Sequence, residues 1–141
     1  MPAEELSAEN RKAAEPLIDM FGEGEIRKLF SKTWQLRDEA ISSIEAMVMN
    51  ERDQDGAFVN GVGVVRFTVQ DKMAGVAQKS MNFMAAVCQT YPNVSLGGQS
   101  RGVFNSYTDV ILATLAEKLG DNLQKVRGSA EEAFIASAGH P

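Results

Sequence analysis

Apolar residues recur along most of this chain at intervals of three and four, the spacing that places them on one face of an α-helix. Four such stripes are well defined, and each predicts an amphipathic helix. They are formed by Leu36, Ala40, Ile41, Ile44, Met47 and Val48; by Val76, Ser80, Met81, Met84, Val87 and Cys88; by Val103, Tyr107, Val110, Ile111, Thr114 and Leu115; and by Val126, Ala130, Ala133 and Phe134.

The helices are joined in pairs by short connections. Residues 26–30 predict a short helix ahead of the first stripe, and residues 32–34 lead from it directly into the next helix. A connection of this length makes two helices antiparallel, so we expect them to pack as a hairpin. The partner of the second stripe is ambiguous, because Val65, Phe67 and Val69 alternate as in a strand and residues 61–63 contain two glycines that weaken a helix.

The second helices of the pairs share a common register. Leu36, Val76 and Val126 align, and the positions four and eight residues later align with them at offsets of 40 and then 50 residues. The residues that follow are Ala40, Ser80 and Ala130, and then Ile44, Met84 and Phe134. Repeats of this length with two helices each are typical of HEAT and armadillo arrays. The chain is therefore predicted to be all-α, an α-solenoid of about three HEAT-like hairpins.

An N-terminal capping helix precedes the repeats. Ser7 is a suitable N-cap for a first helix, and Pro16 begins a second apolar stretch that stops at Gly22. We expect one domain over residues 1–141. Its parts are a capping segment at 1–22, repeat one at 24–50, repeat two at 57–91 and repeat three at 101–138.

The charge of the chain narrows the classes of partner. A net charge of −5 argues against broad binding to nucleic acid or to an anionic membrane, both of which need an excess of Lys and Arg. The N-terminus lacks the features of a signal peptide, and no apolar run approaches the length of a membrane span. We therefore expect a soluble cytoplasmic protein that meets any acidic partner through a local basic surface.

Such a surface is predicted at one edge of the solenoid, because every loop within a pair turns toward the same side. The three turns, at 32–35, 72–75 and 121–125, would then form a line that includes the only tryptophan, Trp34. The line and the helix starts beside it carry Lys32, Trp34, Arg37, Lys72, Lys125 and Arg127. Two alternatives remain open: Trp34 as a core residue between two helices, and Arg37 in an ion pair with Glu39, Asp38 or an acidic residue of the neighbouring helix.

Catalytic and metal-binding residues are scarce. The only histidine, His140, lies beside the C-terminal residue, and the only cysteine, Cys88, lies on an apolar stripe and is expected in the core. Asp53 and Asp55 begin a sequence similar to a calcium loop, but its twelfth position is Val62, which has no carboxylate. The sequence therefore predicts neither an enzyme nor a bound metal or cofactor.

Three segments resemble TOG domains, the tubulin-binding arrays of HEAT repeats found in microtubule polymerases and ciliary proteins. They are Glu15-Pro16-Leu17-Ile18-Asp19-Met20-Phe21-Gly22, the stretch from Leu29 to Ala40 (LFSKTWQLRDEA), and the stretch from Leu119 to Arg127 (LGDNLQKVR). A TOG domain holds about six HEAT repeats. The resemblance therefore covers about the N-terminal half of such a domain, the half that would face β-tubulin.

The resemblance implies a non-catalytic partner site for αβ-tubulin or a microtubule end, built from the loops within the repeats. By position, the tubulin-binding residues would be Lys32, Thr33, Trp34, Arg37, Lys72, Met73, Lys125 and Arg127. It also implies a place on the cytoskeleton, at the cilium tip, basal body or centrosome, with other ciliary or centrosomal proteins as further partners.

Two other functions compete with this hypothesis. The chain is alternatively a HEAT scaffold for a different protein, with Trp34 buried. A third alternative is a structural role, in which the repeats cap or extend a longer solenoid. An exposed apolar patch around Phe134 and Ile135 would favour that role, and would also make self-association through the last helix plausible.

Overall fold

The computed structural model describes residues 3–139. Over this range the chain is helical and has no strand, which confirms the predicted all-α class. None of the helices described is long and apolar enough to cross a membrane. The helices are α1 (Ala8–Ala13), α2 (Glu15–Phe21), α3 (Glu23–Leu29), α4 (Trp34–Met49), α5 (Gln54–Thr68), α6 (Ala74–Thr90), α7 (Gly98–Lys118) and α8 (Gln124–Ala138).

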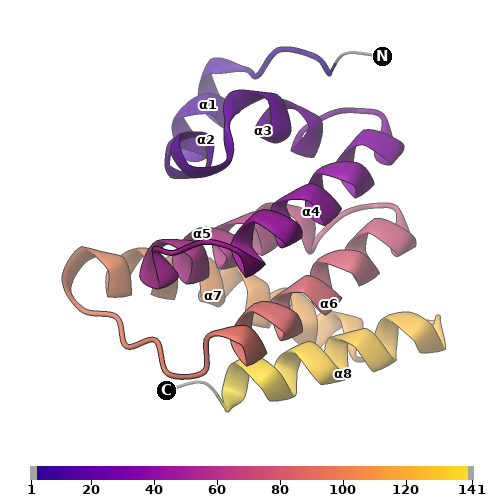
Figure 1. Ribbon diagram of the computed structural model, residues 1–141. Coiled ribbons are helices and arrows are strands. Elements are labelled where there is room, and N and C mark those ends of the chain that lie inside the picture. The colour runs from indigo at the N-terminus through magenta and orange to yellow at the C-terminus, as the bar shows by residue number, and fades with distance from the viewer. Residues whose placement is uncertain (1–2, 140–141) are drawn as a thin grey trace.

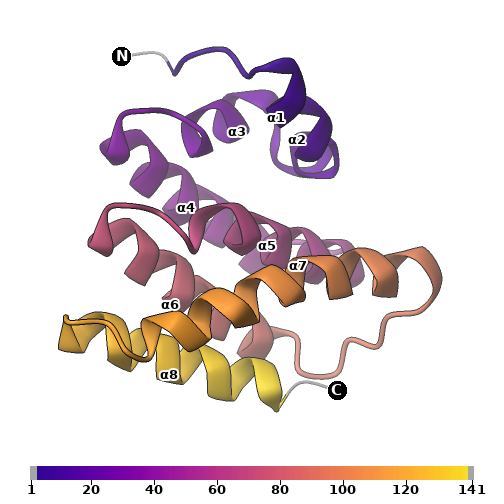
Figure 2. The same cartoon turned by 180° about the vertical axis from the view of Figure 1, so that it is seen from behind.

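Three helical hairpins, α3–α4, α5–α6 and α7–α8, are stacked one on another (Figure 1). Helices α4, α6 and α8 lie side by side in one layer, with α6 in contact with both neighbours. Helices α5 and α7 form the second layer, which faces the viewer in Figure 2. Helices α1 and α2 cover the N-terminal end, where α2 packs on α3 and α5. This arrangement is the predicted α-solenoid with an N-terminal cap.

Helix α5 is the element that the hydrophobic pattern left undecided. It begins after Asp53, whose carboxylate accepts the backbone N–H of Gly56 at 3.0 Å and so caps the helix. The helix then packs against α2, α4, α6 and α7. Because almost every side of α5 is covered, its sequence lacks the polar stripe of an amphipathic helix, and its apolar run therefore resembles a strand.

Two glycines let the neighbours of α5 approach its backbone. A Cβ atom at Gly61 would lie 3.3 Å from Val87 of α6. A Cβ atom at Gly63 would lie 2.9 Å from the ring of Tyr107 and 3.0 Å from Leu17. Glycine weakens an isolated helix, but Gly61 lets α6 of the other layer come close to α5, and Gly63 does the same for α7 and α2.

The predicted register of the second helices describes the core well, with two exceptions. The first is Leu36, which is only half-buried, whereas its counterparts Val76 and Val126 are buried. The small residues Ala40, Ser80 and Ala130 are fully buried. The larger residue that follows is buried in the first two hairpins, as Ile44 and Met84, whereas Phe134 in α8 is 36% exposed. Within residues 3–139 the stack ends at α8, so no further helix covers that position.

The Gly63→Ala substitution should destabilise the fold. The new methyl group would overlap the ring of Tyr107, and overpacking costs about 1–3 kcal/mol, only partly offset by the better helix propensity of alanine. We expect the free energy of unfolding in urea to fall by about 1–2 kcal/mol. As a control, Gly102→Ala in α7 has open space around its Cβ position and should raise the free energy of unfolding by up to about 1 kcal/mol. Equal effects of the two substitutions would contradict this account.

Candidate functional site

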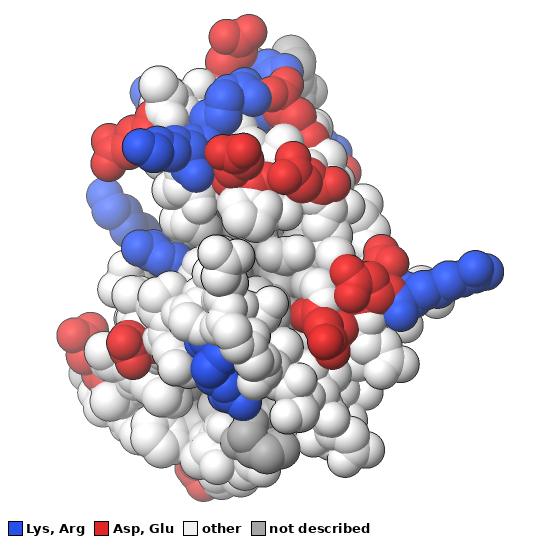
Figure 3. Space-filling model, turned by 90° about the vertical axis from the view of Figure 1, so that its left-hand side faces the viewer, with Lys and Arg blue, Asp and Glu red and all other residues white. Residues whose placement is uncertain are grey.

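The loops that join the two helices of each hairpin lie along a single edge of the molecule. This edge is on the right in Figure 1 and on the left in Figure 2. We call it the loop edge and define it as residues 31–35, 71–75 and 121–125. The opposite edge is different: charges of both signs crowd its upper, N-terminal part, and its lower part is mostly uncharged (Figure 3).

Each loop is closed by the same hydrogen bond, in which a side-chain oxygen accepts the backbone N–H two residues further on. The pairs are Ser31 with Thr33 at 3.0 Å, Asp71 with Met73 at 2.9 Å, and Asp121 with Leu123 at 2.9 Å. The residue before each following helix also has the same extended backbone, with φ between −82° and −88°. The three loops therefore present equivalent positions to solvent in the same way.

A large apolar side chain is exposed in each loop. The exposed fractions are 42% for Trp34, 41% for Met73 and 53% for Leu123. Trp34 is the first residue of α4 and does not plug the core, so the alternative of a buried ring is wrong. Leu123 was missed in the sequence, although it follows Asp121 by the same two residues that separate Met73 from Asp71.

Three lysines accompany these apolar side chains. Lys32, Lys72 and Lys125 are exposed, and none of them forms an ion pair with another residue in the described range. Their charges are therefore available to an acidic partner. Thr33 is also exposed and lies between Lys32 and Trp34.

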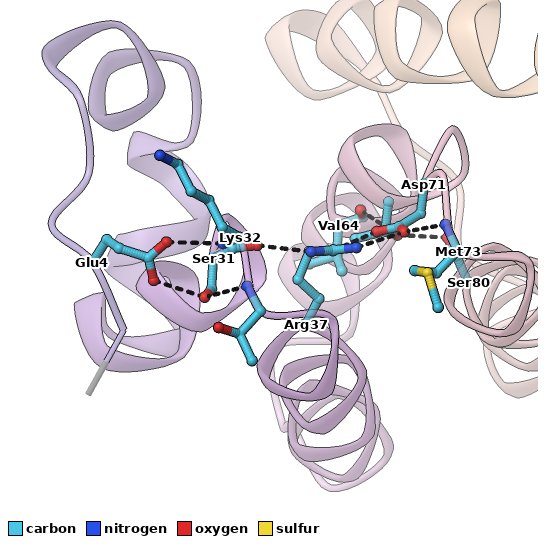
Figure 4. A network of polar contacts seen from close by, with 10 residues as sticks. Glu4, Ser31, Lys32, Arg37, Val64, Asp71, Met73 and Ser80 are labelled. Carbon is cyan, nitrogen blue, oxygen red and sulfur yellow. Dashed lines mark hydrogen bonds and ion pairs between the residues drawn. The ribbon is translucent and has the colours of Figure 1, made fainter. Parts of the chain in front are cut away.

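Arg37, by contrast, is engaged within the fold. Its guanidinium donates to both carboxylate oxygens of Asp71, from Nε to Oδ2 at 2.6 Å and from Nη2 to Oδ1 at 2.9 Å. Nη1 donates to the carbonyl oxygen of Ser31 at 2.9 Å. The two side chains are only 16% and 7% exposed, and the hydrogen bonds to Asp71 raise the pKa of Arg37. Arg37 thus ties the first loop to the second (Figure 4).

Arg127 also donates hydrogen bonds to backbone carbonyl groups, here within the third loop. Its Nη1 donates to the carbonyl oxygen of Asp121 at 2.7 Å and to that of Asn122 at 3.2 Å. The side chain is half-buried. The equivalent position of the second hairpin is Ala77, so only the first and third loops have an arginine at this place.

The first loop has an additional support from the N-terminal segment. The Glu4 carboxylate accepts the Lys32 backbone N–H at 2.9 Å and the Ser31 hydroxyl at 2.8 Å (Figure 4). Arg27 in turn holds the carbonyl oxygens of Ala3 and Glu4. The backbone bond from Lys32, and then the bond from Ser31, lower the pKa of Glu4 from its ordinary 4.5. The support is therefore intact at neutral pH and weakens as pH falls through that lowered value.

The residues considered above for catalysis or metal binding do not form a reactive group in the described part of the chain. Cys88 is buried, as expected, and burial raises the pKa of its thiol to about 11, far from the range of a reactive thiolate. Asp53 caps α5, and His140 lies outside the described residues. Among residues 3–139, no group of three or more His, Cys, Asp or Glu side chains is placed to hold a metal ion.

Comparison with known proteins identifies the fold. No family model matches the chain. The solved structure of the TOG domain of human Cep104 superposes with a TM-score of 0.77 and 21% sequence identity, over 98% of this chain and 55% of that one. A second CEP104 TOG domain structure gives a TM-score of 0.74 and 23% identity, over 93% of this chain and 53% of that one. The chain therefore has the fold of a TOG domain and spans about half the length of these structures.

Removal of the Arg37 guanidinium should destabilise the protein more than removal of an exposed one. Arg37→Ala leaves the nearly buried Asp71 carboxylate without its ionic partner, and we expect a loss of about 2–3 kcal/mol in the free energy of unfolding. The control is Arg11→Ala, which breaks the pair with Glu23 on the surface and should cost less than about 1 kcal/mol. Urea titrations followed by circular dichroism measure both. Similar losses in the free energy of unfolding for the two variants would show that the buried ion pair stabilises the fold no more than the exposed one.

Proposed function

We propose that this chain is a non-catalytic module that binds αβ-tubulin through the loop edge. The observation that carries the proposal is the repetition along that edge of an exposed apolar side chain beside an unpaired lysine. The three combinations are Trp34 with Lys32, Met73 with Lys72, and Leu123 with Lys125. The TOG fold supports tubulin as the partner, because the resemblance to TOG domains implies that the loops within the repeats bind it.

The chemistry of these side chains suits an acidic protein surface. Trp34 offers a large, rigid area for burial, and such aromatic residues commonly dominate the energy of an interface. Lysines at the rim attract an acidic partner and accelerate the encounter more than they tighten the complex. The charges are local, so the net charge of −5 does not oppose the interaction.

The two arginines and Glu4 have a different role in this proposal. All three side chains form hydrogen bonds with backbone groups of the loops, and these bonds hold the loop edge in position. The residues are Arg37, Arg127 and Glu4. The residues proposed to contact tubulin directly are Lys32, Thr33, Trp34, Lys72, Met73, Leu123 and Lys125. This division differs from the sequence-based hypothesis, in which Arg37 and Arg127 were themselves contacts.

The extent of the chain sets the expected strength of binding. It spans about half the length of the solved TOG domains, and the half that the resemblance indicates is the one facing β-tubulin. We therefore expect a modest affinity that is best detected at low ionic strength, where surface charges act over a longer range.

The fold also suggests where in the cell the protein acts. The solved structures that it matches are TOG domains of Cep104, and we propose a cytoskeletal location at the cilium tip, basal body or centrosome. Other ciliary or centrosomal proteins are further candidate partners.

A second candidate interaction involves the last helix. Phe134 and Ile135 of α8 are 36% and 65% exposed, and the surface around the end of α8 is mostly uncharged (Figure 3). Exposed apolar side chains in the last hairpin of a stack are typical of a surface that packs on another helical element. We propose self-association through this surface at high protein concentration.

The tubulin proposal is tested by size-exclusion co-elution with purified αβ-tubulin at low salt. Trp34→Ala should weaken binding by about 2 kcal/mol, close to thirtyfold, since the largest exposed apolar side chain of the edge is lost. Met47→Ala is the matched control, because Met47 is 40% exposed on the same helix but away from the loop edge. Circular dichroism verifies that both variants are helical. Absence of a wild-type complex, or equal binding by all three proteins, would reject the proposal.

The self-association proposal is tested by sedimentation velocity over a wide range of protein concentration. Wild-type protein should shift toward larger species as its concentration rises, whereas Ile135→Lys should stay monomeric, because a buried lysine opposes the contact. A wild-type protein that remains monomeric throughout would exclude the contact.

A further inference from the structure

A hollow opens on the loop edge between the first and second loops. Its volume is about 320 Å³. It is lined by Leu29, Phe30, Ser31, Arg37, Phe67, Gln70, Asp71 and Lys72. These residues belong to α4, to the ends of α3 and α5 and to the turns that follow those two helices, so the hollow lies between the first two hairpins. None of the interactions described above fills it.

The floor of the hollow is aromatic. The rings of Phe30 and Phe67 meet edge to face, with centroids 5.2 Å apart and an interplanar angle of 63°. Both side chains are only partly buried against the core, so part of each ring faces the hollow. An edge-to-face pair of this kind offers an apolar surface and a defined geometry to a further apolar group.

The wall and the rim differ in charge. The Asp71 carboxylate is paired within the fold, since it accepts two hydrogen bonds from Arg37 and one from the Met73 backbone N–H. The wall thus presents an ion pair that is already neutralised. The rim carries Lys72, which is exposed and forms no ion pair with another described residue, whereas the side chain of Lys32 points away from the Arg37–Asp71 pair (Figure 4). The hollow therefore combines an apolar floor with a cationic rim.

We propose that this hollow receives one apolar side chain, of the size of phenylalanine or leucine, from an acidic polypeptide segment of the partner. Its volume of about 320 Å³ lies at the lower end of the range of ligand pockets, about 300–1,000 Å³, and leaves room for one such side chain. A carboxylate beside that side chain would meet Lys72. The inference rests on the proposed function in taking tubulin as the natural source of the segment.

The hollow gives the loop edge a second anchoring point in addition to Trp34. Trp34 projects into the partner, whereas the hollow accepts a group from it. An interface that contains both a projecting side chain and a pocket contributes affinity and also fixes the orientation of the partner, because the two contacts must form at the same time. The Arg37–Asp71 pair acts here as a positioning element, since it holds the two sides of the hollow at a constant distance.

The probe for this inference is a capped, glutamate-rich peptide with one central phenylalanine. The matched peptide has serine in place of phenylalanine, so the protein need not be altered. Titration is followed by two-dimensional amide NMR of the full chain. We expect shifts in the signals of residues 29–32 and 70–73, and an affinity about tenfold higher for the phenylalanine peptide, as the partial burial of one aromatic side chain requires.

Charge at the rim is tested with a protein variant. Lys72→Glu should weaken binding of the phenylalanine peptide by about fivefold. Lys12→Glu makes the same change at an exposed lysine of α1, away from the loop edge, and should leave binding unchanged. Equal effects of the two variants would show that attraction is a property of the whole protein surface and would overturn the assignment of the rim.

Other outcomes also decide the matter. Equal affinity for the two peptides, or shifts confined to other parts of the chain, would overturn the inference. Signals of the hollow that move on dilution of the protein alone would show that a second copy fills it. Tubulin co-elution separates the two proposals. Peptide binding without a tubulin complex rejects the tubulin function and leaves the hollow in place, whereas a tubulin complex with no preference for the phenylalanine peptide rejects the hollow alone.

Discussion

The ion pair between Arg37 and Asp71 is the interaction on which the candidate site depends. It joins residues 34 positions apart in the sequence and connects the first two loops directly. The same guanidinium binds the Ser31 carbonyl, and the same carboxylate closes the second loop at Met73. The pair therefore fixes the first two loops relative to each other and joins the two sides of the hollow, together with the packing of α4 on α6 and the ion pair between Lys79 and Asp38.

Helix packing provides the second constraint. The buried helix α5 lies against α2, α4, α6 and α7, and two of its glycines let the neighbouring side chains approach its backbone. Since α5 ends in the second loop and α7 ends in the third, the close packing of these two helices sets the spacing of the corresponding loops. The loop edge is thus a product of the core, and its apolar residues are exposed because the hairpins turn there.

The sequence predicted the helices with one polar face, because their period of three and four residues is a local property. It left residues 57–69 undecided because α5 is covered on nearly all sides. The partner of Arg37 was foreseen only as an acidic residue nearby, since contacts between distant residues depend on the stacking of hairpins. Glu4 was missed for the same reason, because the path of the N-terminal segment emerges only in the folded chain. Leu123, by contrast, could have been found from its spacing to Asp121, which equals that of Met73 to Asp71.

The arginine position that the second hairpin lacks has a mechanical consequence. Arg37 locks the first loop to the second, but Ala77 has no group that reaches toward the third, so among the described residues no ion pair joins these two loops. A single neutral hydrogen bond, from Gln70 to Thr114 at 3.1 Å, bridges α7 and the end of α5 nearby. The third hairpin is therefore held to the second mainly by helix packing, of α6 on α8 and of α5 on α7, whereas the first two hairpins also share an ion pair at the loop edge.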